Sequence, residues 1–313
     1  MKPMTLIVST LIFVLFACSD SAPAPISNKT TASEIVASNN SVTTDQTDAI
    51  SPRYKNGTND QNKGDKTGIV RLHGNIAAAS GSMMYLYETE ARNIALLDSA
   101  KVVGGIFNFN NLEIGRGIYE LVLNGKANNK TQIILNPDES DVDIDFKSSR
   151  LAGNKTAPSS RENTAWFKYT TLANRNRNEI KNLRKGIKDS PYRSRIEEQI
   201  KGKELELVQS QHEMMDTYAG TYFAKLISWE NPMYPNSQGK YFEDLDPLDN
   251  SLIHTMAISN RIQGMMVKYS KGEDSGFFAC IDLIKAHFEP NPKTLESALY
   301  AMLDGFYNTG KED

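Results

Sequence analysis

The side chains of this chain that could do chemistry are its two cysteines, its four histidines and a group of closely spaced aspartates. Cys18 and Cys280 lie too far apart in the sequence to form the Cys-x-x-Cys pair of a redox or zinc site. His73 has no second His or Cys and no suitably spaced acid nearby, so it lacks the ligands of a metal site. His212 has Asp216 four residues on, and one His with one acid does not fill a coordination sphere. We therefore expect structural histidines, no metal and no cofactor.

Asp141, Asp143 and Asp145 have the spacing that opens a calcium-binding loop. The helix-loop-helix version of that loop also needs Gly at its sixth position and Glu at its twelfth, where this chain has Phe146 and Ala152. Apolar residues alternate with the three aspartates, as they do in a strand with one buried face. We expect the aspartates on the solvent side of a strand, and a cation site is the alternative.

No catalytic motif accompanies these residues. The chain has no Gly-x-Ser-x-Gly, no His-Glu-x-x-His, no phosphate-binding loop and no dinucleotide fingerprint. Cys280 falls on the apolar stripe of an expected helix between Phe277 and Phe288, which indicates a buried, inert thiol. The sequence therefore assigns no catalytic residue.

The N-terminus has the pattern of a secretory signal peptide over residues 1–17. Met1-Lys2 supplies a positive charge, and the apolar run from Leu6 to Phe16 is too short to span a bilayer. The stretch Leu15–Cys18 resembles the cleavage box of bacterial lipoproteins. That resemblance implies that the Cys18 sulfur carries a diacylglyceryl group and that Cys18 becomes the mature N-terminus. An ordinary signal peptide followed by a chance cysteine is the alternative.

By the same resemblance, Ser19 and Asp20 favour the outer membrane over the inner one. We therefore expect a protein of the cell envelope of a Gram-negative-type bacterium, attached to the membrane through its N-terminal lipid. Whether it faces the periplasm or the cell surface is left open. Residues 18–66 are rich in Ser, Thr, Asn, Asp, Ala and Pro without periodic apolar positions, so we predict a disordered linker behind the lipidated end.

Composition limits the remaining possibilities. The length of 313 residues suits two modest domains. Lys and Arg number 35 against 38 Asp and Glu, and a formal charge of -3 argues against the chain-wide basic surface of a nucleic-acid-binding protein. We therefore expect no nucleic-acid partner. The hydrophobic fraction of 39% is low for a globular chain, which agrees with a long linker that packs no core.

Residues 67–150 carry the pattern of an antiparallel β-sandwich. Short runs rich in β-branched and aromatic residues alternate with Gly and Asn turns, and Gly104-Gly105 is the signal of a two-residue hairpin. Some seven strands in such a short stretch indicate a sandwich or barrel. The expected strands are 69–76, 83–88, 94–103, 106–109, 117–123, 132–135 and 142–146.

The run from Leu97 to Phe109 resembles part of a β-sandwich domain of unknown function that precedes the thioredoxin domain in membrane-anchored TlpA-like thiol-disulfide oxidoreductases. Met84–Tyr87 and Gly117–Leu121 fall where that family places strands, and a helical segment follows as it does there. The resemblance covers residues 68–310. The chain lacks the Trp-Cys-x-x-Cys site of the redoxin domain, so the resemblance implies the non-catalytic part of a redox lipoprotein and no catalytic residue.

Residues 151–313 are expected to form an all-helical module. Apolar residues recur at helical spacing from Trp166 to Ile187 and again from Leu205 to Leu226, with His212 on the apolar seam of the second stretch. This spacing predicts two long antiparallel helices. Three shorter helices are expected around 253–269, 277–288 and 295–306. The complete expectation is an α+β fold of two modules, a β-sandwich followed by helices.

Two surfaces of the helical module could bind a partner. The segment Lys168–Arg195 has an excess of Lys and Arg, which favours either a solvated helix face or a contact with anionic lipid headgroups, acidic glycans or an acidic protein. The other surface is an aromatic loop that follows the long helices. The basic face comprises Lys168, Arg175, Arg177, Lys181, Arg184, Lys185 and Lys188, and the aromatic loop comprises Trp229, Tyr234, Tyr241 and Phe242.

These expectations describe a non-catalytic envelope lipoprotein that acts as a binding or scaffold module, and not an enzyme. One alternative is an accessory or truncated member of a thiol-disulfide oxidoreductase system, with a redoxin as its partner. Another is a module that captures a small molecule or glycan on the aromatic loop. The sequence identifies neither the ligand nor the protein partner.

Overall fold

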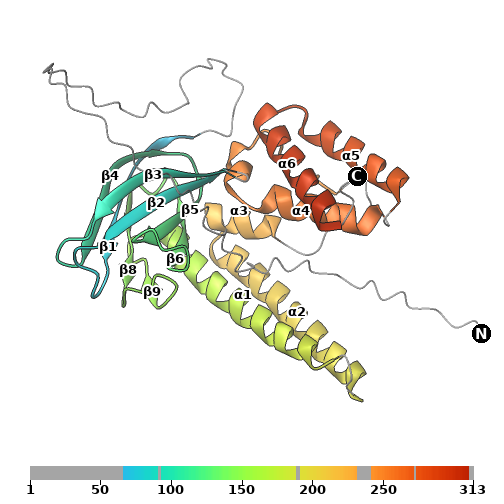
Figure 1. Ribbon diagram of the computed structural model, residues 1–313, viewed down its shortest axis with the longest axis horizontal. Coiled ribbons are helices and arrows are strands. Elements are labelled where there is room, and N and C mark those ends of the chain that lie inside the picture. The colour runs from blue at the N-terminus through green and yellow to red at the C-terminus, as the bar shows by residue number, and fades with distance from the viewer. Residues whose placement is uncertain (1–65, 91–92, 188–190, 231–240, 271–272, 310–313) are drawn as a thin grey trace, which may run out of the picture. The chain divides into compact units, whose positions relative to one another are not determined.

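The computed structural model describes residues 66–90, 93–187, 191–230, 241–270 and 273–309, which belong to one compact unit (Figure 1). The signal peptide, Cys18 and all but the last residue of the expected linker lie outside these ranges, so what the sequence indicates for them stays a prediction. None of the helices in the described ranges combines the length and the hydropathy that crossing a bilayer requires.

Nine strands precede the helices in the described part of the chain. Seven of them build two sheets, a three-stranded sheet in the order β4-β1-β7 and a four-stranded sheet in the order β3-β2-β5-β6, while β8 and β9 form a separate hairpin. The strand-rich module predicted from the sequence is confirmed. The bounds are β1 (Gly68–Asn75), β2 (Met83–Glu90), β3 (Asn93–Lys101), β4 (Ile106–Ile114), β5 (Gly117–Leu123), β6 (Lys130–Leu135), β7 (Asp141–Asp143), β8 (Asp145–Phe146) and β9 (Lys155–Thr156).

Alternation of apolar and polar residues places one face of each strand in the core. In β1, Val70 and Leu72 are fully buried while their neighbours in sequence are partly or wholly exposed. The same alternation runs through β7 and β8, where Val142 is fully buried and Asp141 is exposed. The expectation that the apolar neighbours of the aspartates point into the core is confirmed.

Two details of the sheets differ from the prediction. Gly104-Gly105 does form a two-residue turn with positive φ at both glycines, closed by hydrogen bonds between Val103 and Ile106, but β3 and β4 then diverge into different sheets. The strand at Asp141–Asp143 pairs with β1 in the parallel sense, so the sandwich is not wholly antiparallel. A parallel neighbour needs no tight turn, and turn signals in the sequence therefore do not reveal it.

The helices follow in the order α1 (Arg161–Lys185), α2 (Arg193–Thr217), α3 (Tyr222–Trp229), the short 3-10 helix η2 (Asn250–His254), α4 (Ala257–Tyr269), α5 (Asp274–Phe288) and α6 (Pro292–Thr309). The Ser160 side chain caps α1 by accepting a hydrogen bond from the backbone N–H of Asn163. α1 and α2 form the expected long antiparallel pair, and α4, α5 and α6 correspond to the three shorter helices (Figure 1). The predicted α+β fold class is confirmed.

The second long helix was predicted with the wrong length and the wrong face. α2 ends at Thr217, Gly220 adopts a positive φ of 80°, and Thr221 caps a new helix, α3. The predicted apolar spacing treated α2 and α3 as one continuous helix, and it therefore assigned the wrong residues to the buried face of α2. Leu205, placed on the seam by that spacing, is 57% exposed, and the residues of α2 that are buried are Ile200, Leu207 and Gln211.

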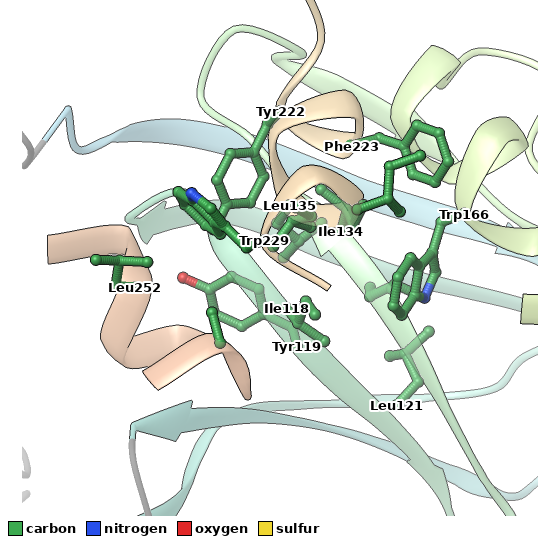
Figure 2. Close-up of a cluster of buried hydrophobic side chains, with 14 of the residues drawn as sticks. Ile118, Tyr119, Leu121, Ile134, Leu135, Trp166, Tyr222, Phe223, Trp229 and Leu252 are labelled. Carbon is green, nitrogen blue, oxygen red and sulfur yellow. The ribbon is translucent and has the colours of Figure 1, made fainter. Parts of the chain in front are cut away.

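The β module and the helices share one hydrophobic cluster. Figure 2 shows Ile134 and Leu135 of β6 beside Trp166 of α1 and Phe223 of α3. All four side chains are at most 4% exposed. The predicted boundary near residue 150 therefore separates two modules of a single compact unit.

Two polar side chains at the start of α1 fix the helices to the sheet. Asn163 closes the edge of β6, since it accepts a hydrogen bond from the backbone N–H of Ile134 at 2.8 Å and donates one to the carbonyl of Ile134 at 2.7 Å. Glu162, which is 3% exposed, accepts hydrogen bonds from the first backbone N–H groups of α3 at Tyr222 (2.8 Å) and Phe223 (2.6 Å). A carboxylate at a helix N-terminus is favourable, so this contact sets the position of α3 against α1.

Candidate anion-binding groove

A groove with a volume of about 670 Å³ lies between the β8–β9 hairpin and the exposed side of α1. The hairpin and its loop supply one wall, from Lys147 and the segment 152–157. The first four turns of α1 supply the other wall, from Thr164 to Arg175. β9 contacts α1, and Figure 1 shows the β8–β9 hairpin near the start of this helix. The two walls of the groove therefore come from elements that pack against each other. We call this site the basic groove.

The hairpin wall is held by a residue outside the groove. Phe146 pairs with Lys155 in the β8–β9 ladder, and the loop between these strands is fixed by Asn129. The Asn129 carboxamide accepts a hydrogen bond from the backbone N–H of Leu151 at 2.9 Å and donates one to the carbonyl of Ser149 at 2.8 Å. Leu151 is itself fully buried. The loop is therefore anchored both by hydrogen bonds and by an apolar side chain.

The helical wall follows from the amphipathic pattern of α1. Trp166, Tyr169 and Ala173 point to the core. The exposed residues Lys168, Thr171 and Arg175 line the groove. The Thr164 hydroxyl donates a hydrogen bond to the carbonyl of Ala157 at 2.8 Å, which ties the helix to the end of the hairpin. The spacing between the two walls is thus set by a direct contact.

Four cations line the basic groove, and no acidic residue does. Lys147 and Lys155 make no ion pair with any described residue. The Nζ atom of Lys168 lies 3.1 Å from the hydroxyl oxygen of Tyr218 and 5.8 Å from the centre of the Tyr218 ring. Arg175 has a loose contact of 3.9 Å with Glu179 on its own helix. The positive charge of the groove is therefore almost entirely unneutralised by the protein.

Lys155 is the most buried of these cations. Burial lowers its pKa below the ordinary value of 10.5, because desolvation disfavours the charged amine and no carboxylate compensates. Its Nζ atom lies 4.9 Å from the centre of the Phe167 ring, which gives it a cation–π contact. A bound anion would supply the counter-charge that this amine lacks.

The predicted basic face is divided by the structure. Lys168 and Arg175 line the groove, while Arg177 lies about 200° further round the helix than Arg175 and points elsewhere. Arg184 is paired with Glu204 of α2 at 3.2 Å. The remaining cations of that face are Lys181 and Lys185, which are exposed, and Lys188, which lies outside the described residues.

Lys147 and Lys155 were missed by the sequence analysis. They lie on the short hairpin that follows the last strand predicted, and no local spacing connects them with the charges of α1. Only the fold brings the segment 145–156 beside α1. The sequence signal was weak, because Lys147 closely follows the three aspartates and Lys155 has no charged residue within four positions on either side.

Three of the four residues assigned to the predicted aromatic loop are buried. Trp229 is 4% exposed, Tyr241 1% and Phe242 4%, so these three side chains belong to the core, and Tyr234 lies outside the described residues. Arg261 holds the buried ends of this segment together, since its guanidinium donates hydrogen bonds to the carbonyls of Tyr241 (2.9 Å) and Trp229 (3.3 Å). The reason for the error is physical, because aromatic residues near a loop are as suited to covering a core as to binding a ligand.

The histidines and the remaining cysteine have mixed outcomes. His73 meets two of the aspartates in space, with Nε2 at 3.1 Å from Asp141 and Nδ1 at 3.5 Å from Asp143. His212 is exposed, so the expectation of a core histidine is wrong there. Cys280 is fully buried, as predicted. The described residues contain no group of three or more His, Cys, Asp or Glu side chains arranged for a metal ion.

The assignment of a function depends on the chemistry of the basic groove, because comparison with known proteins adds nothing to it. No family model, no curated protein and no solved structure matches this chain.

Proposed function

We propose that this protein is a non-catalytic envelope lipoprotein that captures an anionic ligand in the basic groove. The observation that carries the proposal is the set of four cations that line the groove without an acidic residue. Within a folded protein, charges of one sign are normally paired or moved into solvent. A concave site that keeps its cations unpaired is suited to a ligand that brings the negative charge.

The remaining parts of the proposal come from the sequence. Cys18 would carry the lipid that attaches the chain to the envelope membrane, and residues 19–66 would connect this anchor to the binding unit. The binding reaction needs no nucleophile and no redox pair. The fully buried Cys280 thiol is poorly placed for redox exchange.

The proposal is tested by measuring the affinity of the detergent-solubilised full-length protein for dextran sulfate, with neutral dextran as the comparison polymer. One variant combines Lys155→Ala, Lys168→Ala and Arg175→Ala. A matched control combines Lys126→Ala, Arg195→Ala and Lys201→Ala, which removes three exposed cations outside the groove.

We expect the wild type and the control to bind dextran sulfate alike and the groove variant to lose about 100-fold in affinity or more, since each charged hydrogen bond contributes ~1.5–3 kcal/mol. Circular dichroism should show that both variants keep the fold. An equal loss in the two variants would mean that net charge, and not the groove, attracts the polymer.

A further inference from the structure

We infer that the ligand of the basic groove is an acidic glycan, a chain of sugars that carries carboxylate groups, and that it extends from the groove along the outer face of α1. This inference rests on the proposed function and adds the chemical class of the ligand. The uncharged side chains of the groove, the length of the charged surface and the positions of the exposed apolar residues support it.

Three of the four threonines that line the groove, Thr164, Thr170 and Thr171, can act toward a ligand only as hydrogen-bond acceptors. The hydroxyls of Thr170 and Thr171 donate to the helix carbonyls of Trp166 (2.8 Å) and Phe167 (2.7 Å), and the hydroxyl of Thr164 donates across the groove wall as described above. Their hydrogens are therefore used within the protein, and only their lone pairs are available to a ligand. A sugar hydroxyl can donate a hydrogen to each of these acceptors, whereas a phosphomonoester dianion has no hydrogen to give and an inorganic phosphate dianion has one at most.

Two amides add to this pattern. Asn154 on the hairpin and Asn174 on α1 face the same groove, and neither side chain has a hydrogen-bond partner among the described residues. A carboxamide presents a donor and an acceptor side by side, which matches two neighbouring hydroxyls of a sugar ring. Together with the cations, the groove offers what a ligand with both hydroxyls and carboxylates requires.

The polar surface continues beyond the groove. Asn174, Asn178 and Asn182 are exposed and four residues apart, so they form a row along one face of α1. Lys185 is exposed near the end of this row, and it lies about 26 Å along the helix axis from Lys168. A single headgroup or phosphate does not span that distance, whereas a chain of several sugars does.

The distribution of exposed apolar residues argues against a membrane surface as the ligand. A helix that binds at a lipid interface places large apolar side chains beside its cations. The large exposed hydrophobic side chains of the described residues lie on the strands and the other helical segments, and none lies on α1 or on the β8–β9 hairpin. Lipid headgroups therefore lack the anchoring contacts that would hold them here.

The test uses the full-length protein in detergent and polygalacturonate oligomers of increasing length as the probe, with inorganic phosphate and vesicles of phosphatidylglycerol in phosphatidylcholine as the other arms. We expect affinity to rise with oligomer length until the chain covers the row on α1, with weak binding of phosphate and of vesicles. Thr171→Val and Asn174→Ala should each lower the affinity for the oligomers by about threefold to tenfold, the range of one neutral hydrogen bond, and leave dextran sulfate binding nearly unchanged.

A variant with Asn178→Ala, Asn182→Ala and Lys185→Ala should bind short oligomers like the wild type and lose the gain with length. The matched control remains Lys126→Ala, Arg195→Ala and Lys201→Ala. Tighter binding to the vesicles than to any oligomer would overturn the glycan inference in favour of lipid. Insensitivity to Thr171→Val, Asn174→Ala and the row variant would overturn it in favour of any polyanion, while the proposed function would stand. Absence of binding to every anionic probe, dextran sulfate included, would overturn both.

Discussion

Charged side chains gather in two regions of the protein, the outer face of β1 and β7 around Asp141, which we call the acidic face, and the basic groove. The two regions differ in how far their charges are paired within the fold. On the acidic face, Asp141 accepts two hydrogen bonds from the Arg71 guanidinium, at 2.8 and 2.9 Å, and a third contact from His73. In the groove, Lys155 is more buried than Arg71 or Asp141 and has no carboxylate beside it. Charges that are matched within the fold belong to its structure, and charges left unmatched in a concave site are available to a ligand.

The ionisation behaviour of the two regions reflects this difference. The hydrogen bonds from Arg71 lower the pKa of Asp141 below its ordinary value, so the fold stabilises the charged form. Burial lowers the pKa of Lys155, so the fold disfavours the charged form. The acidic triplet is matched only in part, because Asp141 pairs with Arg71 whereas burial and the neighbouring Asp145 raise the pKa of Asp143.

Among single substitutions, the largest expected effect comes from Lys155→Met, which keeps the length of the side chain and removes the charge. We expect the affinity for dextran sulfate to fall by at least about tenfold, the range of one charged hydrogen bond. The melting temperature should stay the same or rise, because an uncompensated buried charge is lost. Affinity titrations and thermal melts check this, and a clear fall in melting temperature with unchanged affinity would show that Lys155 is structural.

Proton uptake on binding should be the next largest effect. The pKa of Lys155 is lowered in the free protein, and a bound anion raises it, so binding takes up protons in the pH range between the two values. Affinity falls as pH rises across that range and levels off above it. For the same reason Lys155 destabilises the fold fully below its lowered pKa, and that cost disappears as pH rises past 10.5. Calorimetry in buffers with different ionisation enthalpies measures the uptake.

The matched control for that measurement is Lys155→Met, in which the uptake should be absent. If the variant takes up as many protons as the wild type, another group in the groove titrates and Lys155 is not responsible.

Asp141→Asn should produce a smaller effect, confined to stability. The pKa of Asp141 is lowered in the folded protein, so its contribution is present above the ordinary value of 3.8 and is lost as pH falls through the lowered one. The pair with Arg71 is largely exposed, and we therefore expect a small fall in melting temperature at neutral pH. In acid, the melting temperature of the variant should depend less on pH than that of the wild type. Affinity for dextran sulfate should not change, and a lower affinity would break the distinction between the two regions.

Glu179→Gln should have the smallest effect. Among the residues that the structure describes, Glu179 is the one carboxylate within ion-pair distance of a groove cation. It lies 3.9 Å from Arg175 and also pairs with Lys203 at 2.9 Å. Its removal leaves Arg175 only the weaker electrostatic attraction of Glu206, so affinity for anionic polymers should rise by about twofold, the scale of an exposed ion pair. Competition titration resolves such a difference, and a fall in affinity would mean that Glu179 positions Arg175 for the ligand.

The sequence predicted those parts of the fold that local patterns determine. The alternation around Val142 placed the aspartates correctly, and the spacing from Trp166 to Ile180 identified the buried face of α1. The break at Gly220 was missed because apolar residues on both sides of it happened to continue one spacing. Local periodicity does not distinguish one long helix from two helices that pack on the same core.

The candidate site was only half predicted, for a related reason. Lys168 and Arg175 stood out because they belong to a run of basic residues on one helix, whereas Lys155 contributes through a hairpin whose position depends on Asn129. Contacts between distant segments leave no spacing signal in a single sequence. Trp229 shows the opposite error, since a loop-associated aromatic residue suggested a surface and turned out to be core.

The two hydrogen bonds between Asn129 and the hairpin loop affect how fast a ligand associates. Because Leu151 and Ser149 are already fixed, little of this wall has to be ordered during the encounter. Association is then governed by diffusion and by the long-range attraction of the groove cations, which accelerates the approach of an anion. That attraction is screened over a Debye length of ~10 Å at 0.1 M salt, so added salt should slow association far more than it speeds release. We therefore expect the ligand to associate fastest at low ionic strength.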